Sequence, residues 1–451
     1  MTTFPSNFTW GVAAAAYQIE GAHDADGRGP SVWDAFCQQP GKIREGHSGA
    51  VACDHYHRWA EDVALMRELG VKAYRLSIGW PRVLPQGVGA INQPGLDFYD
   101  RLIDALLEAG ITPWVTLFHW DYPLALYNQG GWLNPASPHW FAEYATTIAK
   151  RLGDRVRHWF THNEPQCFIG LGHATGLHAP GLKLGLGDLI PAGHHMLLAH
   201  GLAVQAIRAH CPKALVGMAP VGRVKFPATD APADLELARR SMFNGTKHWH
   251  NSWYSDPAYL GHYPADGLAV YEPLLPRGWE RDLATIAQPL DFYGANIYGA
   301  TPVQAGPKGE ELRPGHAFGG RRTAFDWIVT PESLYWGPRF FYERYQKPIV
   351  ITENGMASSD WPALDGKVYD PQRIDFTARH LLALRQAIAD GTNVSGYFHW
   401  SILDNFEWQE GYTKRFGLIY VDYATQRRII KQSAYWYADL IASNGALLDQ
   451  R

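Results

Sequence analysis

One supersecondary unit recurs along this 451-residue chain: an amphipathic helix, a glycine, and then a short apolar segment. Apolar residues recur on one helical face over 59–69, Gly70 is a helix-ending residue, and residues 71–78 alternate like a strand. The same order recurs at 96–118 and at 374–399. Helices that alternate with strands form a parallel sheet covered on both faces, so the pattern predicts an α/β fold.

Eight segments are predicted strands, and eight βα units close into a (β/α)8 TIM barrel. A doubly wound open sheet is the competing arrangement. Because barrels with insertions can exceed about 400 residues, we predict a single domain over residues 1–451. Two less regular stretches, 170–193 and 221–289, are interpreted as loop insertions at the C-terminal face of the strands. The predicted strands are Phe8–Ala13, Ala73–Ile78, Trp114–Phe118, Val156–Thr161, Leu215–Met218, Phe292–Asn296, Ile349–Thr352 and Gly396–His399.

Charge and composition exclude several classes of partner. A formal net charge of -4 gives no basic field for nucleic acid or an anionic membrane surface. No apolar run reaches the roughly 18 residues of a membrane span, and the first residues lack the basic and apolar regions of a signal peptide. The four cysteines form no CxxC pair, so we expect free thiols and a cytoplasmic location.

We expect neither a metal centre nor a cofactor. His194 and His195 are adjacent and point apart on a helix, and the chain has no HExxH motif or cysteine cluster. It also has no Walker loop or GxGxxG sequence. Cys167 has no accompanying base motif and is interpreted as a packing residue.

Polar and indole side chains follow six of the predicted strands, where a barrel places its catalytic residues. Two of them are glutamates, Glu164 in the segment 161–165 and Glu353 in the segment 351–355. A pair of carboxyl groups that flanks one bond is what glycoside cleavage requires. Arg75 is predicted to keep Glu353 ionised, whereas partial burial and the Glu353 charge hold Glu164 protonated. The sequence does not give the distance between the two carboxyl groups, which distinguishes a retaining from an inverting enzyme.

Three neighbours of these glutamates have predicted positions. Tyr298 is expected to donate a hydrogen bond to Glu353, and Asn163 to bind the sugar hydroxyl beside the reacting carbon. His162 should alternate away from the cleft, where it has little effect on the chemistry.

Five motifs resemble those of the family 1 glycoside hydrolases, the β-glucosidase family, and the resemblance spans about residues 4–437. It implies one (β/α)8 barrel that hydrolyses β-glycosides with retention and without a metal. It also implies that Glu164 is the acid/base and Glu353 the nucleophile. The motifs are Phe8-Thr9-Trp10-Gly11, Ala16-Tyr17-Gln18-Ile19-Glu20-Gly21, Thr161-His162-Asn163-Glu164-Pro165, Ile351-Thr352-Glu353-Asn354-Gly355 and Asp404-Asn405-Phe406-Glu407-Trp408.

The resemblance further assigns a set of substrate-binding residues. Trp327 matches a tryptophan that commonly stacks on the aglycone, and His162 replaces the family's usual Phe or Leu. The predicted substrate-binding residues are Gln18, His119, Trp120, Asn163, Asn296, Tyr298, Trp327, Trp400, Glu407 and Trp408, with Arg75 behind them.

The Glu407-Trp408 pair narrows the predicted class of substrate. The family's 6-phospho branch has a Ser and a Lys-x-Tyr phosphate grip at this point, and a carboxylate there would repel a phosphate. The prediction is therefore a β-glucosidase for small, unphosphorylated β-glucosides or oligosaccharides. β-Galactosidase or β-fucosidase specificity, transglycosylation, and a sugar-binding barrel without catalysis are the alternatives.

Overall fold

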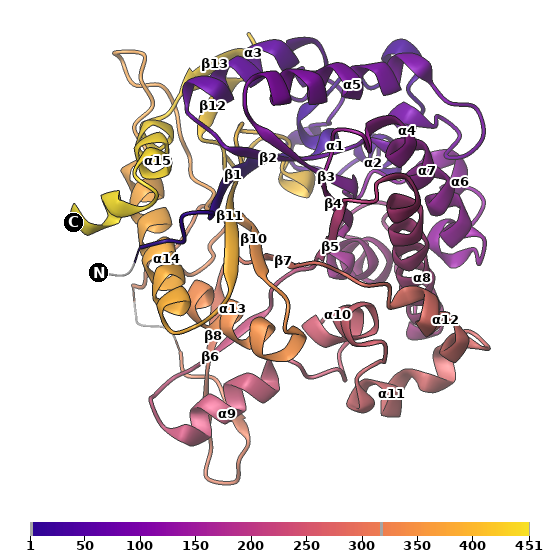
Figure 1. Ribbon diagram of the computed structural model, residues 1–451, viewed down its shortest axis with the longest axis vertical. Coiled ribbons are helices and arrows are strands. Elements are labelled where there is room, and N and C mark those ends of the chain that lie inside the picture. Colours follow the sequence, from indigo (N-terminus) through magenta and orange to yellow (C-terminus); the bar gives the residue numbers. More distant parts are fainter. Residues whose placement is uncertain (1–2, 316–318, 451) are drawn as a thin grey trace.

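A computed structural model describes residues 3–315 and 319–450, and eight parallel strands form a nearly closed barrel at its centre (Figure 1). Every predicted strand segment contributes one of them. The α/β prediction is therefore confirmed. The strands are β1 Thr9–Ala13, β2 Ala73–Ser77, β3 Thr112–Phe118, β4 His158–Asn163, β5 Leu215–Ala219, β7 Tyr293–Asn296, β10 Ile349–Asn354 and β11 Val394–Trp400.

Closure of the sheet separates the barrel from the doubly wound alternative. The strands pair in the order β5-β4-β3-β2-β1-β11-β10-β7, so β5 and β7 are the two ends. Backbone hydrogen bonds join these ends: the N–H of Asp291 donates to Val216 O at 2.9 Å, and that of Asn296 to Pro220 O at 3.1 Å. The (β/α)8 TIM barrel is the observed fold, which brings all eight carboxyl ends to one face.

Amphipathic helices cover the outside of the barrel (Figure 1). α5 buries one side, including Leu102 and Leu106, and keeps charged residues outward. Gly70 and Gly110 adopt φ of 66° and 72° just after α3 and α5, a conformation that favours glycine and ends both helices where predicted. The covering helices include α3 His55–Glu68, α5 Gln93–Glu108, α7 Ser137–Leu152, α8 Leu186–His210, α13 Glu332–Tyr345, α14 Pro371–Ala389 and α15 Gln432–Ala442.

The two predicted insertions hold more regular structure than a loop. Residues 170–193 contain the end of a π-helical segment, Gln166–Thr175, and the start of α8. Internal prolines obscure the helical pattern, as Pro191 does in α8. The insertion 221–289 contains β6 Val224–Pro227, α9 Pro232–Ser241, α10 Asn251–Leu260, α11 Ala265–Tyr271 and α12 Trp279–Ile286. Small sheets add β8 Ala300–Ala305, β9 Glu311–Leu312, β12 Ile419–Asp422 and β13 Arg427–Ile430.

The two ends of the described chain meet on the barrel. The Trp10 indole N–H donates to Asn444 Oδ1 at 2.9 Å, and the Tyr437 hydroxyl donates to Gly11 O at 2.8 Å. Helix α15 is thereby held against β1. Among the described helices, none combines the length and the apolar character needed to cross a membrane.

Candidate active site

A cavity of about 710 Å³ opens at the carboxyl ends of the barrel strands. It receives side chains from the ends of β4, β7, β10 and β11 and from the residues just after β3. Gln18, Asn163 and Arg75 lie behind its wall and contact residues of the site. The predicted residues that line it are His119, Trp120, Glu164, Asn296, Tyr298, Trp327, Glu353, Trp400, Glu407 and Trp408.

Glu353 lies between a cation and a hydroxyl donor. Arg75 Nη1, from β2, donates to Glu353 Oε1 at 2.6 Å, and the Tyr298 hydroxyl donates to Oε2 at 2.8 Å. Burial raises the pKa of Glu353 above its usual range, while the Arg75 charge and both hydrogen bonds oppose that rise. Every polar contact of this carboxyl therefore stabilises its charged form.

Glu164 has a different environment, although it lies in the same cavity. Its Oε1 accepts a hydrogen bond from Asn296 Nδ2 at 2.9 Å, and no cation forms an ion pair with it in the described part of the chain. Burial, and then the negative charge of Glu353, raise the pKa of Glu164 to about 7. The two carboxyl groups thus differ in environment: Glu353 is paired with a cation, whereas Glu164 is not, and the pKa of Glu164 is raised to about 7.

Asn163 links the two glutamates to His119. Its Oδ1 accepts from Arg75 Nη2 at 2.6 Å and from Asn296 Nδ2 at 3.0 Å. These bonds fix the amide orientation, so Asn163 Nδ2 donates to His119 Nε2 at 3.0 Å. Burial holds the pKa of His119 well below its usual range, so the neutral ring accepts at Nε2 and carries its proton on Nδ1.

Gln18, behind the cavity wall, and Glu407, in the wall, each have a buried oxygen with no hydrogen-bond partner among the described residues, Oε1 and Oε2 respectively. Gln18 Nε2 donates to Phe406 O at 2.9 Å and to Asn405 Oδ1 at 3.1 Å, which ties Gln18 to the segment that carries Glu407. Buried acceptors of this kind are normally paired, so this wall is suited to a ligand that donates several hydroxyl groups. Burial, followed by the charges of Glu353 and Glu164, raises the pKa of Glu407.

Aromatic rings enclose the cavity. Trp120 and Trp408 pack with ring centroids 4.4 Å apart, and His119 stacks on Trp400 at 5.8 Å. The Trp120 indole N–H donates to Asn163 O at 3.0 Å, so only its ring is presented to the cavity. Trp327 is 40% exposed at the mouth of the cavity, where a flat ring is available to a second ligand group.

One residue of the cavity was predicted only as a packing residue, and two others were not predicted from the sequence. Cys167 lines the cavity beside Glu164, and burial keeps the pKa of its thiol well above the usual range, which leaves it protonated. Arg223 and Trp249, from the insertion 221–289, also line it, but no motif marks them. His162 lies outside the cavity, fully buried, as its alternation predicted.

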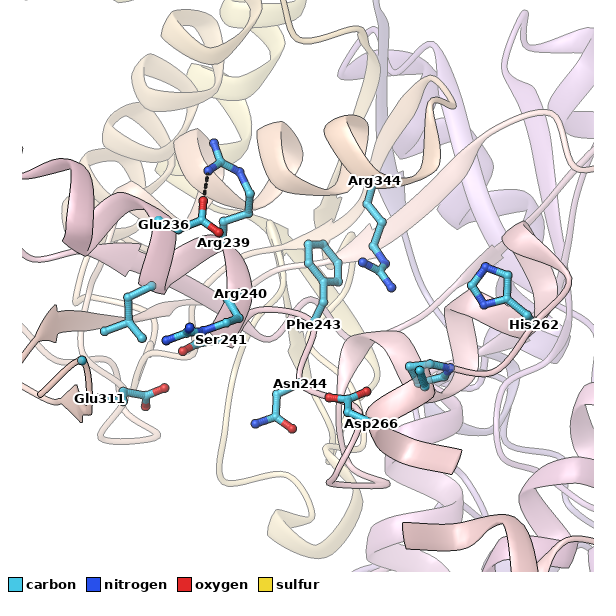
Figure 2. Close-up of a pocket in the computed structure, with 14 residues that line it drawn as sticks. Glu236, Arg239, Arg240, Ser241, Phe243, Asn244, His262, Asp266, Glu311 and Arg344 are labelled. Atoms are coloured by element: carbon cyan, nitrogen blue, oxygen red, sulfur yellow. Dashed lines mark hydrogen bonds and ion pairs between the residues drawn. The ribbon is translucent and has the colours of Figure 1, made fainter. Parts of the chain in front are cut away.

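A second cavity, of about 720 Å³, lies beside α9 and away from the strand ends (Figure 2). Several of its charged residues are engaged in ion pairs: Arg239 pairs with Glu236 at 2.7 Å, and Arg344 pairs with Asp256 outside the cavity. None of the motif residues lines it. The chemistry-bearing motifs therefore converge only on the first cavity within the described chain.

A (β/α)8 barrel that holds two buried carboxyl groups of unequal proton affinity, among indole, imidazole and amide side chains, defines a glycoside-cleaving class of enzyme. The chain belongs to glycosyl hydrolase family 1, whose model matches residues 1–446. The family resemblance inferred from the motifs is thereby confirmed.

Relatives cover nearly the whole chain. It is 44% identical over 451 residues to a 1,4-β-D-glucan glucohydrolase of Thermotoga neapolitana, covering 99% of each chain. It is 42% identical over 468 residues to a bifunctional β-D-glucosidase/β-D-fucosidase of Bifidobacterium breve, covering 98% of this chain and 99% of that one. A Thermotoga maritima β-glucosidase structure in complex with glucoimidazole superposes with a TM-score of 0.91 at 43% identity, covering 99% and 100% of the two chains.

Proposed function

We propose that this protein is a retaining β-glucosidase of small β-glucosides and oligosaccharides. The observation that carries the proposal is the unequal environment of its two carboxyl groups. Glu353 is paired with Arg75 and accepts from Tyr298, whereas burial and the Glu353 charge raise the pKa of Glu164 to about 7. A charged carboxylate facing a protonated one is the arrangement required for double displacement.

In the first step, Glu353 attacks the anomeric carbon and forms a glycosyl–enzyme ester. The bond to the leaving oxygen breaks, and Glu164 gives that oxygen its proton. In the second step, Glu164, now a carboxylate, takes a proton from water. The water oxygen attacks the anomeric carbon from the opposite face, so Glu353 is released and the configuration is retained.

The glycone is proposed to lie beside His119, Glu407 and Gln18, because the unpaired Glu407 Oε2 and Gln18 Oε1 suit sugar hydroxyls. Glucose is the preferred sugar in this proposal because the relatives are named for glucan and glucoside cleavage. β-Fucoside cleavage is the second candidate, since one relative at 42% identity is named for both activities. The remaining substrate contacts are proposed at Trp120, Asn163, Asn296, Tyr298, Trp327, Trp400 and Trp408.

The roles of the two glutamates predict distinct variants. Glu353→Ala removes the nucleophile and should abolish turnover of 4-nitrophenyl β-glucoside. Glu164→Ala should lower kcat roughly 10²–10⁴-fold for substrates whose leaving group needs a proton. Added azide should yield the inverted glucosyl azide with Glu353→Ala and the retained one with Glu164→Ala, as product NMR would measure.

Glu343→Ala, an exposed glutamate on α13, is the matched control and should keep wild-type rates. In the wild type, kcat/KM should decline as the pH rises through about 7, because Glu164 then loses the proton that it must donate. Full activity in Glu353→Ala, or a retained azide product from it, would overturn the assignment.

We also propose a cytoplasmic location and one catalytic domain over residues 1–451. Four free cysteines, three of them buried, support a reducing compartment. The single closed barrel, whose first strand contacts α15, supports one domain. Fractionation of native cells, with a cytoplasmic marker enzyme, tests the location.

A further inference from the structure

Arg223 is an unpaired cation in the wall of the active-site cavity. It and Arg322 are the two cationic side chains that line it. Arg322 lies 3.3 Å from Asp326, and the Arg75 behind the wall is paired with Glu353. Arg223 is exposed and forms no ion pair with any acidic residue that the structure describes. Its guanidinium is therefore available to an anion that enters the cavity.

The backbone at Arg223 is fixed by a buried amide. The N–H of Arg223 donates to Asn251 Oδ1 at 2.9 Å, and Asn251 Nδ2 donates back to Arg223 O at 2.9 Å. The preceding residue, Gly222, donates its N–H to Asn296 O at 2.8 Å. Since Asn296 also holds Glu164, the position of Arg223 is tied to the proposed acid. These hydrogen bonds therefore hold the Arg223 backbone in place in the cavity wall.

The surroundings of Arg223 have an excess of positive charge. Lys225 Nζ lies 3.6 Å from Glu311 Oε1, and Arg313 Nε lies 2.8 Å from the same atom, so one carboxylate serves two cations (Glu311 is labelled in Figure 2). Loss of hydration beside the cavity wall, and then the Arg313 charge, lower the pKa of Arg223. A bound anion would reduce the repulsion among these cations, whereas a neutral group would leave it unchanged.

Arg223 lies on the leaving-group side of the cavity. The pKa of the Cys167 thiol is raised by burial and then by the Glu164 carboxyl, and it is lowered by Arg223, so both groups lie within electrostatic reach of one side chain. The backbone N–H of Val221 also donates to Gln166 Oε1 at 3.2 Å, which joins this segment to the residues after Glu164. The group that Glu164 protonates is the leaving oxygen, so the aglycone must extend from there.

We propose that Arg223 is a specificity-determining residue, and that this enzyme prefers β-glucosides whose aglycone carries a carboxylate. The inference rests on the proposed β-glucosidase function and adds the chemical class of the leaving group. A guanidinium without an acidic partner forms charge-assisted, two-point hydrogen bonds with a carboxylate and repels a cationic aglycone. Trp327 offers the flat surface for a ring that connects the two.

The test compares 4-carboxybenzyl β-glucoside with its neutral 4-carbamoylbenzyl counterpart, because the methylene group keeps the leaving oxygens similar. The ratio of kcat/KM, carboxylate over carboxamide, should exceed 1 in the wild type. It should fall about tenfold in Arg223→Gln. It should invert in Arg223→Glu, and the wild-type preference should shrink between 0.05 and 0.5 M salt, roughly as screening predicts.

Arg322→Gln is the matched control, since that arginine lines the same cavity but is paired with Asp326; it should change the ratio by less than about twofold. An unchanged ratio in Arg223→Gln would overturn the inference while hydrolysis of the carboxamide upholds the glucosidase function. If the wild type hydrolysed neither glucoside, the proposed glucosidase function itself would be overturned.

Discussion

Three aromatic or acidic residues of the site adopt left-handed backbone conformations: Trp120 at φ 81°, Glu164 at 48° and Trp408 at 51°. For residues with a Cβ, such conformations cost on the order of 1–3 kcal/mol and concentrate at functional sites. At Trp120 and Glu164 they turn the chain just beyond β3 and β4, and at Trp408 they begin a short 3-10 helix; all three side chains line the cavity. The strained backbone conformations therefore occur at residues that line the active-site cavity.

His162 carries the residue-scale stability prediction. It is fully buried among Phe118, Trp132, Phe141 and Phe168, and neither ring nitrogen has a partner in the described chain. A buried unsatisfied polar group costs about 1–3 kcal/mol, so His162→Phe should raise the free energy of unfolding by about 1–2 kcal/mol. Urea unfolding at pH 7 measures it, and kcat should change little.

His173→Phe is the opposing control. Its Nδ1 donates to Phe168 O at 2.7 Å, so the same substitution removes a buried hydrogen bond and should destabilise the protein. If His162→Phe lowered stability as much as His173→Phe, the unsatisfied imidazole would not be the controlling factor.

At the scale of an element, the segment after β11 depends on buried charges. Lys431 Nζ is completely buried and donates to Asp404 Oδ1 at 2.7 Å and to Asp360 Oδ2 at 2.6 Å. Asp404 also accepts from Arg415 Nη1 at 2.7 Å and from the N–H of Gly417 at 2.9 Å. These contacts hold the start of residues 404–408, the segment that presents Glu407 and Trp408 to the cavity.

Lys431→Met should therefore impair both stability and substrate binding. It leaves buried carboxylates without their shared cation, which costs about 3–5 kcal/mol. Because the 404–408 segment loses its anchor, KM for the β-glucoside should rise more than kcat falls. Denaturant unfolding and steady-state kinetics measure the two effects.

The comparison variant is Arg379→Met, which removes an exposed ion pair with Asp375 on α14. Exposed pairs contribute about 0–1 kcal/mol, so this variant should stay close to wild type. Equal losses in the two variants, or an unchanged KM in Lys431→Met, would count against an anchoring role.

At the scale of the whole molecule, buried neutral histidines make the fold sensitive to acid. Burial lowers the pKa of seven of them to about 3 or 4, whereas an unfolded chain titrates near 6.5. Below that pH the unfolded state binds more protons, so stability is lost as the pH falls from about 6.5 to 4. The seven are His158, His173, His178, His200, His250, His380 and His399.

Each such histidine lowers stability by about 1.4 kcal/mol per pH unit in this range, against a typical total of about 5–15 kcal/mol. We therefore expect acid unfolding with a midpoint between about pH 4 and 6. Far-ultraviolet circular dichroism and tryptophan fluorescence should follow one curve if residues 1–451 form one domain. A free energy of unfolding that stays level from pH 7 to 4.5 would contradict this prediction, and separate curves would contradict the single domain.

The strand pattern predicted the barrel closely because it is a local signal. One difference concerns β4, predicted over 156–161 but observed at His158–Asn163. Val156 still belongs to the turn that ends α7, since its N–H donates to Leu152 O at 2.8 Å. An apolar residue in a helix-ending turn and one in a strand look alike in sequence, so only the hydrogen bond separates them.

By itself, the sequence determined the fold class and the motif residues, because periodicity and short motifs involve neighbours in the chain. The tertiary structure decided the different environments of the two glutamates. Glu164 and Glu353 are 353 − 164 = 189 residues apart. Their proton affinities depend on burial and on charges such as Arg75, which the chain brings near only when the barrel closes. The sequence could not predict that Arg223 is unpaired, for the same reason. Whether an arginine has an acidic partner depends on residues that are distant in the chain and become neighbours only in the folded protein.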